Sequence, residues 1–177
     1  MHVHITYTGG TIGMVDSPHG LVPGADLEGW LDSLLKGTPL ARSVSVTSLE
    51  PLIDSSNATP LSWQAIVDDL RAHAAADPRT AFVILHGTDT MAYTSAALSY
   101  ALTDLSVPVV VTGSQLPLGE LGTDAAANVT GALKAATSGR LSGVALFFGH
   151  RLSCSESPGT RSQRITQASS VRPSAWR

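Results

Sequence analysis

The chain has 177 residues and a formal net charge of −3, with 43% hydrophobic and 14% charged residues. This length and composition fit one globular domain, and the scarcity of lysine and arginine argues against nucleic-acid binding, which needs clustered basic side chains. The sequence shows no membrane-spanning run and no signal peptide, and its single cysteine, Cys154, excludes an internal disulfide, so we expect a cytoplasmic protein without membrane or nucleic-acid partners.

The first third of the chain alternates strand-like and helical segments. Residues 3–7 form an apolar, β-branched run that ends at glycine and is typical of a strand. Residues 9–24 are rich in glycine and proline, which favours a turn followed by a mobile loop. Leucines and Trp30 then recur at helical spacing over 27–35, with Asp26 in the N-cap position. A short alternating run at 44–46 predicts the second strand.

The rest of the alternation continues the same pattern to about residue 148. A polar turn over 53–57 precedes a helix that opens at Thr59-Pro60, with proline near its first turn. Further strands are predicted at 81–85, 108–111 and 143–148, separated by helices at 91–102 and 124–136. The apolar strands are continuous, as in sheets covered on both faces. This order predicts an α/β fold with a doubly wound, mainly parallel sheet.

The composition changes after Arg151. From Leu152 onward serine and arginine dominate, and Pro158 and Pro173 interrupt any helical or strand period. We therefore expect an α/β domain over residues 1–151 and an irregular Ser/Arg-rich tail over residues 152–177. A basic tail that binds a partner is the alternative interpretation of this segment.

Two Gly-Thr turns contain the candidate reactive side chains. One runs from Thr8 to Gly13 and the other from His86 to Met91, and each follows a predicted strand. If these strands are neighbours, both turns lie at the sheet edge where open α/β sheets bind ligands, and the hydroxyls of Thr11 and Thr88 with the carboxylate of Asp89 make acyl transfer plausible. The alternatives are an ordinary glycine turn for Thr11 and helix capping for Asp89.

Two other polar turns are candidate binding segments. Asp54-Ser55-Ser56 could hold a carboxylate through hydroxyls and backbone N–H groups, and the turn containing Ser114 has the same character. Either turn could equally be structural. We interpret His86 as a packed histidine, and the remaining histidines show no metal-ligand spacing, so we expect no metal.

Together these segments resemble the bacterial L-asparaginases, specifically the type I cytoplasmic group. The resemblance covers about residues 3–151, where we expect the N-terminal domain of the asparaginase fold. It is carried by residues 7–14 (YTGGTIGM), 51–56 (PLIDSS), 83–94 (VILHGTDTMAYT) and 111–118 (VTGSQLPL), and is extended by Phe147, Phe148 and Arg151.

The resemblance implies hydrolysis of the side-chain amide of L-asparagine to L-aspartate and ammonia, without a cofactor. Thr11 matches the family's nucleophile, and Thr88 and Asp89 match its second threonine and aspartate. Substrate binding falls to Asp89 and to the polar turns, with Asp54, Ser55, Ser56 and Ser114. The resemblance also implies a homo-oligomer. The alternatives are the amidase part of a tRNA-dependent amidotransferase and a non-catalytic amino-acid-binding module.

Three departures from the family pattern lower the activity that we expect. Leu21 stands where the family has a tyrosine that contacts the nucleophile. The family's catalytic lysine falls near Thr160, yet no lysine follows Lys134. We also expect the C-terminal domain to be missing, and we hypothesise a shift of reading frame near codons 151–153, with tail 152–177 out of frame. The expected result is a weakly active or inactive chain, or a non-functional fragment.

Overall fold

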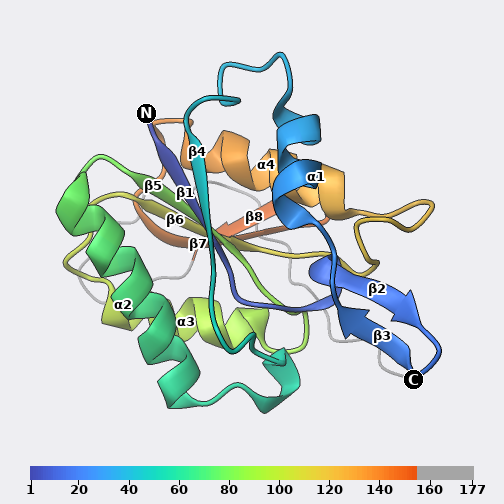
Figure 1. Ribbon diagram of the computed structural model, residues 1–177. Coiled ribbons are helices and arrows are strands. Elements are labelled where there is room, and N and C mark those ends of the chain that lie inside the picture. The colour runs from blue at the N-terminus through green and yellow to red at the C-terminus, as the bar shows by residue number, and fades with distance from the viewer. Residues whose placement is uncertain (155–177) are drawn as a thin grey trace.

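The computed structural model describes residues 1–154 and shows a six-stranded sheet in the order β4-β1-β5-β6-β7-β8 (Figure 1). Five strands pair in parallel, and β8 pairs with β7 antiparallel. The predicted α/β fold with a doubly wound, mainly parallel sheet is therefore confirmed. The strands of this sheet are β1 (Val3–Tyr7), β4 (Val44–Ser48), β5 (Ala81–Leu85), β6 (Pro108–Thr112), β7 (Gly143–Phe148) and β8 (Arg151–Cys154).

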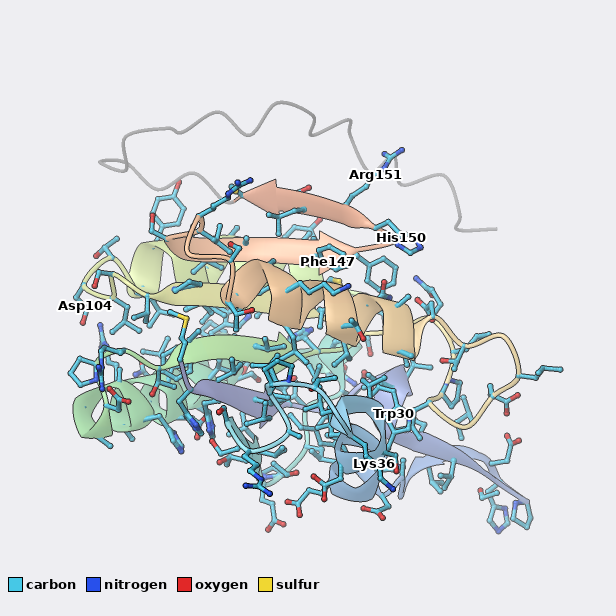
Figure 2. The ribbon with its side chains drawn as sticks, turned by 90° about the horizontal axis from the view of Figure 1, so that it is seen from above. Trp30, Lys36, Asp104, Phe147, His150 and Arg151 are labelled. Carbon is cyan, nitrogen blue, oxygen red and sulfur yellow. The ribbon has the colours of Figure 1, made fainter. Side chains whose placement is uncertain are left out.

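Helices cover both faces of the sheet, with α1 and α4 on one side and α2 and α3 on the other (Figure 1). Side chains alternate along β1, so Val3, Ile5 and Tyr7 join the core under α1 and α4, while His4 and Thr6 take the opposite face. Seen from above, Trp30 on α1 and Arg151 on β8 are separated across the width of the sheet (Figure 2). The helices are α1 (Leu27–Leu35), α2 (Pro60–Ala76), α3 (Met91–Ala101) and α4 (Ala125–Ala136).

Local sequence sets where the first two helices begin. The carboxylate of Asp26 accepts a hydrogen bond of 2.9 Å from the backbone N–H of Gly29, which confirms its N-cap role. Thr59 and Ser62 form a capping box at the start of α2, and Pro60 occupies the first turn. In the described part of the chain, no helix is long and apolar enough to cross a bilayer.

Two segments differ from the sequence-based expectation. The loop predicted over residues 9–24 contains a 3-10 turn, η1 (Thr11–Gly13), and a hairpin of β2 (Met14–Ser17) and β3 (Gly20–Pro23). Every residue of β3 is exposed, so the hairpin has no buried face and leaves no apolar period in the sequence. Residues 152–154, expected in the irregular tail, belong to β8. The rest of that predicted tail lies outside the described residues.

Asn128 on α4 connects the ends of two strands. Its side-chain N–H group donates to the carbonyl oxygen of Gly113 at 2.9 Å, and its carbonyl oxygen accepts from the N–H of Gly149 at 3.1 Å. Asn128 is buried, and its amide also donates to Asp124. One side chain therefore fixes the turn after β6 relative to the turn after β7.

We expect Asn128→Ala to destabilise the domain by about 1–3 kcal/mol, because it leaves the buried carbonyl of Gly113 without its side-chain donor and removes the bond to the N–H of Gly149. Urea denaturation measures this loss. Gln64→Ala is the matched control, since its amide bonds only to an exposed carboxylate on α2. Equal stability of the two variants would contradict a connecting role for Asn128.

Candidate active site

The two Gly-Thr turns follow adjacent parallel strands. β1 pairs with β4 on one side and with β5 on the other. The chain leaves β1 toward β4 and then crosses back to β5, so the strand order changes direction between β1 and β5. Tyr7 stands opposite Leu85 in the register, and both strands end there. Open α/β sheets bind their ligands at this topological switch point. The predicted adjacency of the two turns is confirmed.

The two turns touch through glycine backbone. A Cβ built on Gly10 would lie 2.5 Å from the Cα of Gly87, and Gly10 has φ +92° and ψ 174°, a region that essentially only glycine adopts. A Cβ on Gly9 would overlap the carbonyl of Ile53. Glycine at positions 9 and 10 is therefore required by close contact as well as by conformation.

Backbone hydrogen bonds hold the same turns together. Thr8 donates to the carbonyl of Leu85 through its N–H at 2.9 Å and through its hydroxyl at 3.0 Å. The N–H of Ile53 donates to the carbonyl of Thr8 at 2.6 Å. The turn after β1 is thus bonded to β5 on one side and to the polar turn at Asp54 on the other.

Ser55 packs against the second Gly-Thr turn. Its side chain is buried, and a Cβ on Gly87 would overlap its hydroxyl. Its carbonyl accepts a hydrogen bond of 2.7 Å from the hydroxyl of Thr90. The polar turn η2 (Ser55–Asn57) therefore joins the two Gly-Thr turns in one site.

Asp54 is exposed and organises its own turn. Its carboxylate accepts from the N–H and hydroxyl of Ser56 at 3.0 and 2.7 Å and from the amide of Asn57 at 2.9 Å. These bonds, chiefly those from Ser56, lower the pKa of Asp54 below its usual value. The carboxylate is thereby held as an anion at the rim of the site.

The proposed reacting groups have no partners of their own. Thr11 opens η1 and is partly exposed, Thr88 is partly exposed, and Asp89 is exposed. Within residues 1–154, no hydrogen bond or ion pair engages these three side chains. The N-cap of α3 is Thr90, and no side chain caps that helix, so the alternative capping role of Asp89 is wrong. All three groups are available to a ligand.

Ser114 differs from the other candidates. It is 1% exposed, and its hydroxyl donates to the carbonyl of Leu116 in the same turn. This conformation uses the hydroxyl to shape the turn after β6. The structure therefore brings Thr11, Thr88, Asp89 and the Asp54–Ser56 turn to one edge, with Ser114 buried behind it.

His86 is a packed histidine, as expected. Its Nδ1 lies 2.8 Å from the carbonyl of Gly87, so this nitrogen is assigned the proton, and its Nε2 accepts from the hydroxyl of Thr94 at 3.1 Å. Thr94 in turn accepts from the indole N–H of Trp63 at 3.1 Å. Burial lowers the pKa of His86 below its usual value. The network orients the Gly87 carbonyl in the site.

Leu21 and Tyr7 contrast in burial. Leu21, expected from the sequence to replace a tyrosine of the family, lies on the exposed hairpin strand β3. The sequence places Tyr7 in a predicted strand and in the first family motif without giving it a role, yet its phenol lies against η1, where a Cβ on Gly13 would overlap it. Burial raises the pKa of Tyr7, so the phenol stays neutral. The glycine at position 13 is the signal in the sequence that could have revealed this contact.

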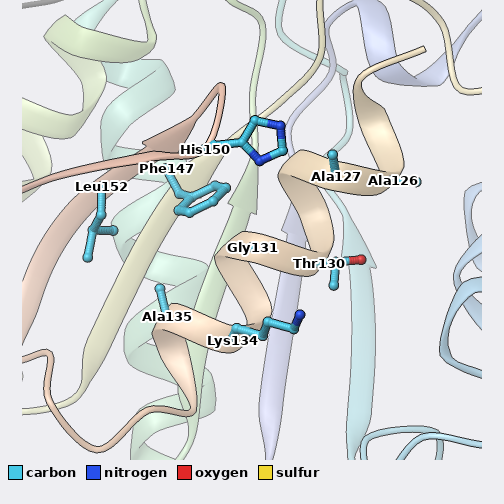
Figure 3. Close-up of a pocket in the computed structure, with 9 residues that line it drawn as sticks. All are labelled: Ala126, Ala127, Thr130, Gly131, Lys134, Ala135, Phe147, His150 and Leu152. Atoms are coloured by element: carbon cyan, nitrogen blue, oxygen red, sulfur yellow. The ribbon is translucent and has the colours of Figure 1, made fainter. Parts of the chain in front are cut away.

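A groove on α4 lies apart from these turns. The ring of Phe147 packs over Gly131, and Lys134 and Leu152 line the same groove (Figure 3). None of the candidate site residues lines it. The groove is thus a separate feature, built between α4 and the β7–β8 turn.

The described residues also contain one cluster that could hold a metal ion, formed by His4, Asp69 and His73. It joins β1 to α2 across their packed faces. Its signal in the sequence is the four-residue spacing of Asp69 and His73, which places both on one face of a helix. His4 comes from a distant strand, so spacing along the chain does not reveal the full set.

The fold and site define a doubly wound α/β domain with hydroxyl and carboxylate groups at its switch point. The sequence profile described as "Asparaginase, N-terminal" matches residues 2–175, and the chain belongs to this family. The match continues past Arg151, where the motif resemblance ended.

Curated relatives agree with this assignment. The chain is 44% identical to L-asparaginase 1 of Escherichia coli K12 over 155 residues, which covers 85% of this chain and 44% of the relative. It is 45% identical over 94 residues to one subunit of a glutamyl-tRNA(Gln) amidotransferase from Haloquadratum walsbyi, covering 51% of this chain and 20% of the relative. The chain thus spans less than half the length of these relatives.

Solved structures agree as well. L-asparaginase I from Vibrio cholerae superposes with a TM-score of 0.74 at 42% identity, covering 87% of this chain and 46% of that structure. A protein described as a probable cytoplasmic L-asparaginase, from Campylobacter jejuni, gives a TM-score of 0.64 at 26% identity, covering 87% of this chain and 46% of that structure. The expected N-terminal domain of the asparaginase fold is therefore confirmed.

We expect Gly10→Ala to destabilise the domain more than Gly20→Ala. Both glycines have positive φ, so each substitution costs about 1–3 kcal/mol of backbone strain. Only Gly10 faces another backbone, and the overlap adds about 1–3 kcal/mol. Thermal and urea unfolding of the two variants measure the difference. Equal losses would mean that contact between the turns does not matter.

We expect the stability of the folded domain to fall as the pH drops below about 6.5, because the unfolded state binds a proton at His86 more readily than the buried imidazole does. The contribution of neutral His86 is complete above that pH. Urea unfolding at about pH 7.5 and about pH 5.5 measures the loss, which is at most about 1.4 kcal/mol per pH unit. His86→Gln should reduce the slope, while His19→Gln, on the exposed hairpin turn, should leave it unchanged. An unaltered slope in His86→Gln would contradict the assignment.

Proposed function

We propose that this chain carries the nucleophile-bearing part of an amidohydrolase site for L-asparagine, with Thr11, Thr88 and Asp89 as its reacting and binding groups. The observation that carries the proposal is the contact between Gly10 and Gly87 at the switch point. Thr11 and Thr88 each follow one of these glycines, and neither has a hydrogen-bond partner among residues 1–154. Membership of the asparaginase family supports the same reaction.

In this proposal the Oγ of Thr11 attacks the carbon of the side-chain amide. The new C–O bond gives a tetrahedral oxyanion, which backbone N–H groups of the glycine turns stabilise. Collapse of the intermediate breaks the C–N bond, and the leaving nitrogen takes up the proton that the Thr11 hydroxyl gave up and departs as ammonia. Water activated near Thr88 then cleaves the acyl-enzyme to give aspartate and free Thr11.

Substrate binding follows from charge. Asp89 is an exposed carboxylate without an ion-pair partner in the described part of the chain, which suits the α-ammonium group of an amino acid. The turn from Asp54 to Ser56 contributes further contacts to the α-amino and α-carboxylate groups. Ser114 contributes through the shape of its turn, since its hydroxyl is already bonded. No step requires a cofactor.

A binding module without turnover is the second candidate. Leu21 offers no hydrogen bond at the position of the family's tyrosine, and the sequence contains no lysine after Lys134. Loss of a general base typically lowers a rate by about 10²–10⁴-fold. The likeness to an amidotransferase subunit supports a third assignment, as an amidase part of such an enzyme.

The wider context of the site is also proposed. The family suggests a homo-oligomer, and the likeness to the probable cytoplasmic L-asparaginase of Campylobacter jejuni supports a cytoplasmic location. We propose a domain over residues 1–151 and an out-of-frame segment over residues 152–177. Reading the genomic DNA around codons 151–153 tests the frame shift. A frame that restores a lysine-bearing continuation supports it, and three frames without one contradict it.

We expect Thr11→Ala to abolish release of ammonia from L-asparagine while keeping the binding of L-aspartate, and Asp89→Asn to weaken that binding. The first removes only the nucleophile, whereas the second removes the charge that pairs with the α-ammonium. A coupled ammonia assay and calorimetric titration measure the two effects. Thr103→Ala, an exposed threonine outside the site, is the control.

The wild-type chain itself separates the candidate functions. Turnover that depends on Thr11 supports hydrolysis. Binding of L-aspartate without turnover supports the binding module, and neither activity in a chain that melts cooperatively contradicts both. Ammonia release that persists in Thr11→Ala would overturn the assignment of the nucleophile.

A further inference from the structure

His4, Asp69 and His73 meet on the α2 face of the sheet, apart from the proposed reacting groups. His4 comes from β1, and Asp69 and His73 come from consecutive turns of α2. One ligand atom from each residue lies within 4.8 Å of the other two. Two imidazoles and a carboxylate are the ligands that zinc and similar divalent transition metals take in proteins.

His4 has a buried nitrogen that the protein does not satisfy. Its side chain is 1% exposed, its Nδ1 lies 2.8 Å from the hydroxyl of Ser45, and its Nε2 has no hydrogen-bond partner. The nearest polar atom is Oδ2 of Asp69 at 3.4 Å, beyond the range of about 2.7–3.2 Å of an N–H···O bond. When Nδ1 donates to Ser45, the lone pair of Nε2 faces a carboxylate, and only a positive charge between them makes that arrangement favourable.

The carboxylate of Asp69 is held in position by a neighbouring side chain. The hydroxyl of Thr6 donates to Oδ2 at 2.6 Å, which orients the carboxylate. A hydrogen bond of this kind from a neighbouring residue is typical of metal-binding carboxylates.

The spacing of two of the ligand atoms suits a tetrahedral ion. Bonds of about 2.1 Å at tetrahedral angles place neighbouring ligand atoms about 3.4 Å apart. Oδ2 of Asp69 lies 3.4 Å from Nε2 of His4. These two ligands therefore need little adjustment to share an ion.

His73 supplies the adjustable ligand. Its ring stacks on that of His4, with centroids 3.5 Å apart and planes inclined by 20°, an arrangement that two imidazolium ions would oppose by charge repulsion. Its Nδ1 bonds to the carbonyl of Asp69 at 2.9 Å, which is the usual partner of the non-ligating nitrogen in metal-bound histidines. The side chain is 37% exposed, so the ring can turn to meet an ion.

We propose that His4, Asp69 and His73 bind one divalent transition-metal ion of the Zn²⁺ class, which connects α2 to β1. Three protein ligands leave a coordination position for water. Ser45 and Thr6 hold two of the ligands in place through the bonds already described. The site has a structural role, and it does not depend on the proposed hydrolysis of asparagine.

The test uses the full, tag-free chain after treatment with a chelator. Calorimetric titration with Zn²⁺ measures affinity, the melting temperature measures stabilisation, and Co²⁺ gives visible absorption that reports coordination geometry. We expect Zn²⁺ to bind at one equivalent and to raise the melting temperature. His73→Ala is the main variant because its partly exposed ring can be removed without opening the core.

We expect His73→Ala to weaken Zn²⁺ binding by at least about tenfold and to abolish the thermal shift, and Ser45→Ala to weaken binding by about 10–100-fold, the effect of removing an outer-shell partner. The controls are His19→Ala and Cys154→Ser, which remove other potential ligands outside the cluster and should bind as the wild type does. Wild-type affinity in His73→Ala, or no binding in the wild type, overturns the proposal. The cluster is then a contact between histidine and carboxylate side chains that holds no metal.

Discussion

The close approach of two glycines, Gly10 and Gly87, is the constraint on which the rest of the site depends. Strand pairing brings the ends of β1 and β5 together, but a side chain on Gly10 would overlap the backbone of Gly87, and one on Gly87 would overlap Ser55. With hydrogen at these positions the turns pack closely, and the next residues, Thr11 and Thr88, lie at the same edge of the sheet. The rigid sheet therefore supplies the placement, and the glycines permit it.

The polar turn at Asp54 is joined to both Gly-Thr turns by different contacts. It is fixed by the bond from Ile53 to Thr8 and by packing of Ser55 against Gly87. Its carboxylate is saturated by its own turn, whereas Asp89 is left open. Of the two acidic residues at this edge, one therefore shapes the site and the other is available to a positively charged group.

The sequence predicted the sheet and its helices well, because buried strands are continuous apolar runs and helices carry an apolar stripe and capping residues. The sequence did not predict some strands whose residues are exposed or only partly buried, because these strands show no regular spacing of apolar residues. The exposed hairpin β2–β3 and the short strand β8 pair through backbone groups, which every residue possesses. Asn128 and Tyr7 were missed because their roles depend on contacts with Gly113, Gly149 and Gly13 from other turns. The cluster at His4 brings a strand residue together with helix residues more than sixty positions away. Local sequence patterns do not reveal such a contact.

The hydrogen-bonded path from Trp63 to Gly87 has an optical consequence. The indole N–H of Trp63 on α2 donates to the hydroxyl of Thr94 on α3, and this hydroxyl donates to Nε2 of His86. His86 follows β5, and its Nδ1–H donates to the carbonyl of Gly87. The indole is thus connected through two side chains, those of Thr94 and His86, to the peptide that precedes Thr88. The fluorescence of an indole depends on whether its N–H is hydrogen-bonded. The emission of Trp63 therefore reports movement of the turn after β5, which has no fluorescent side chain of its own.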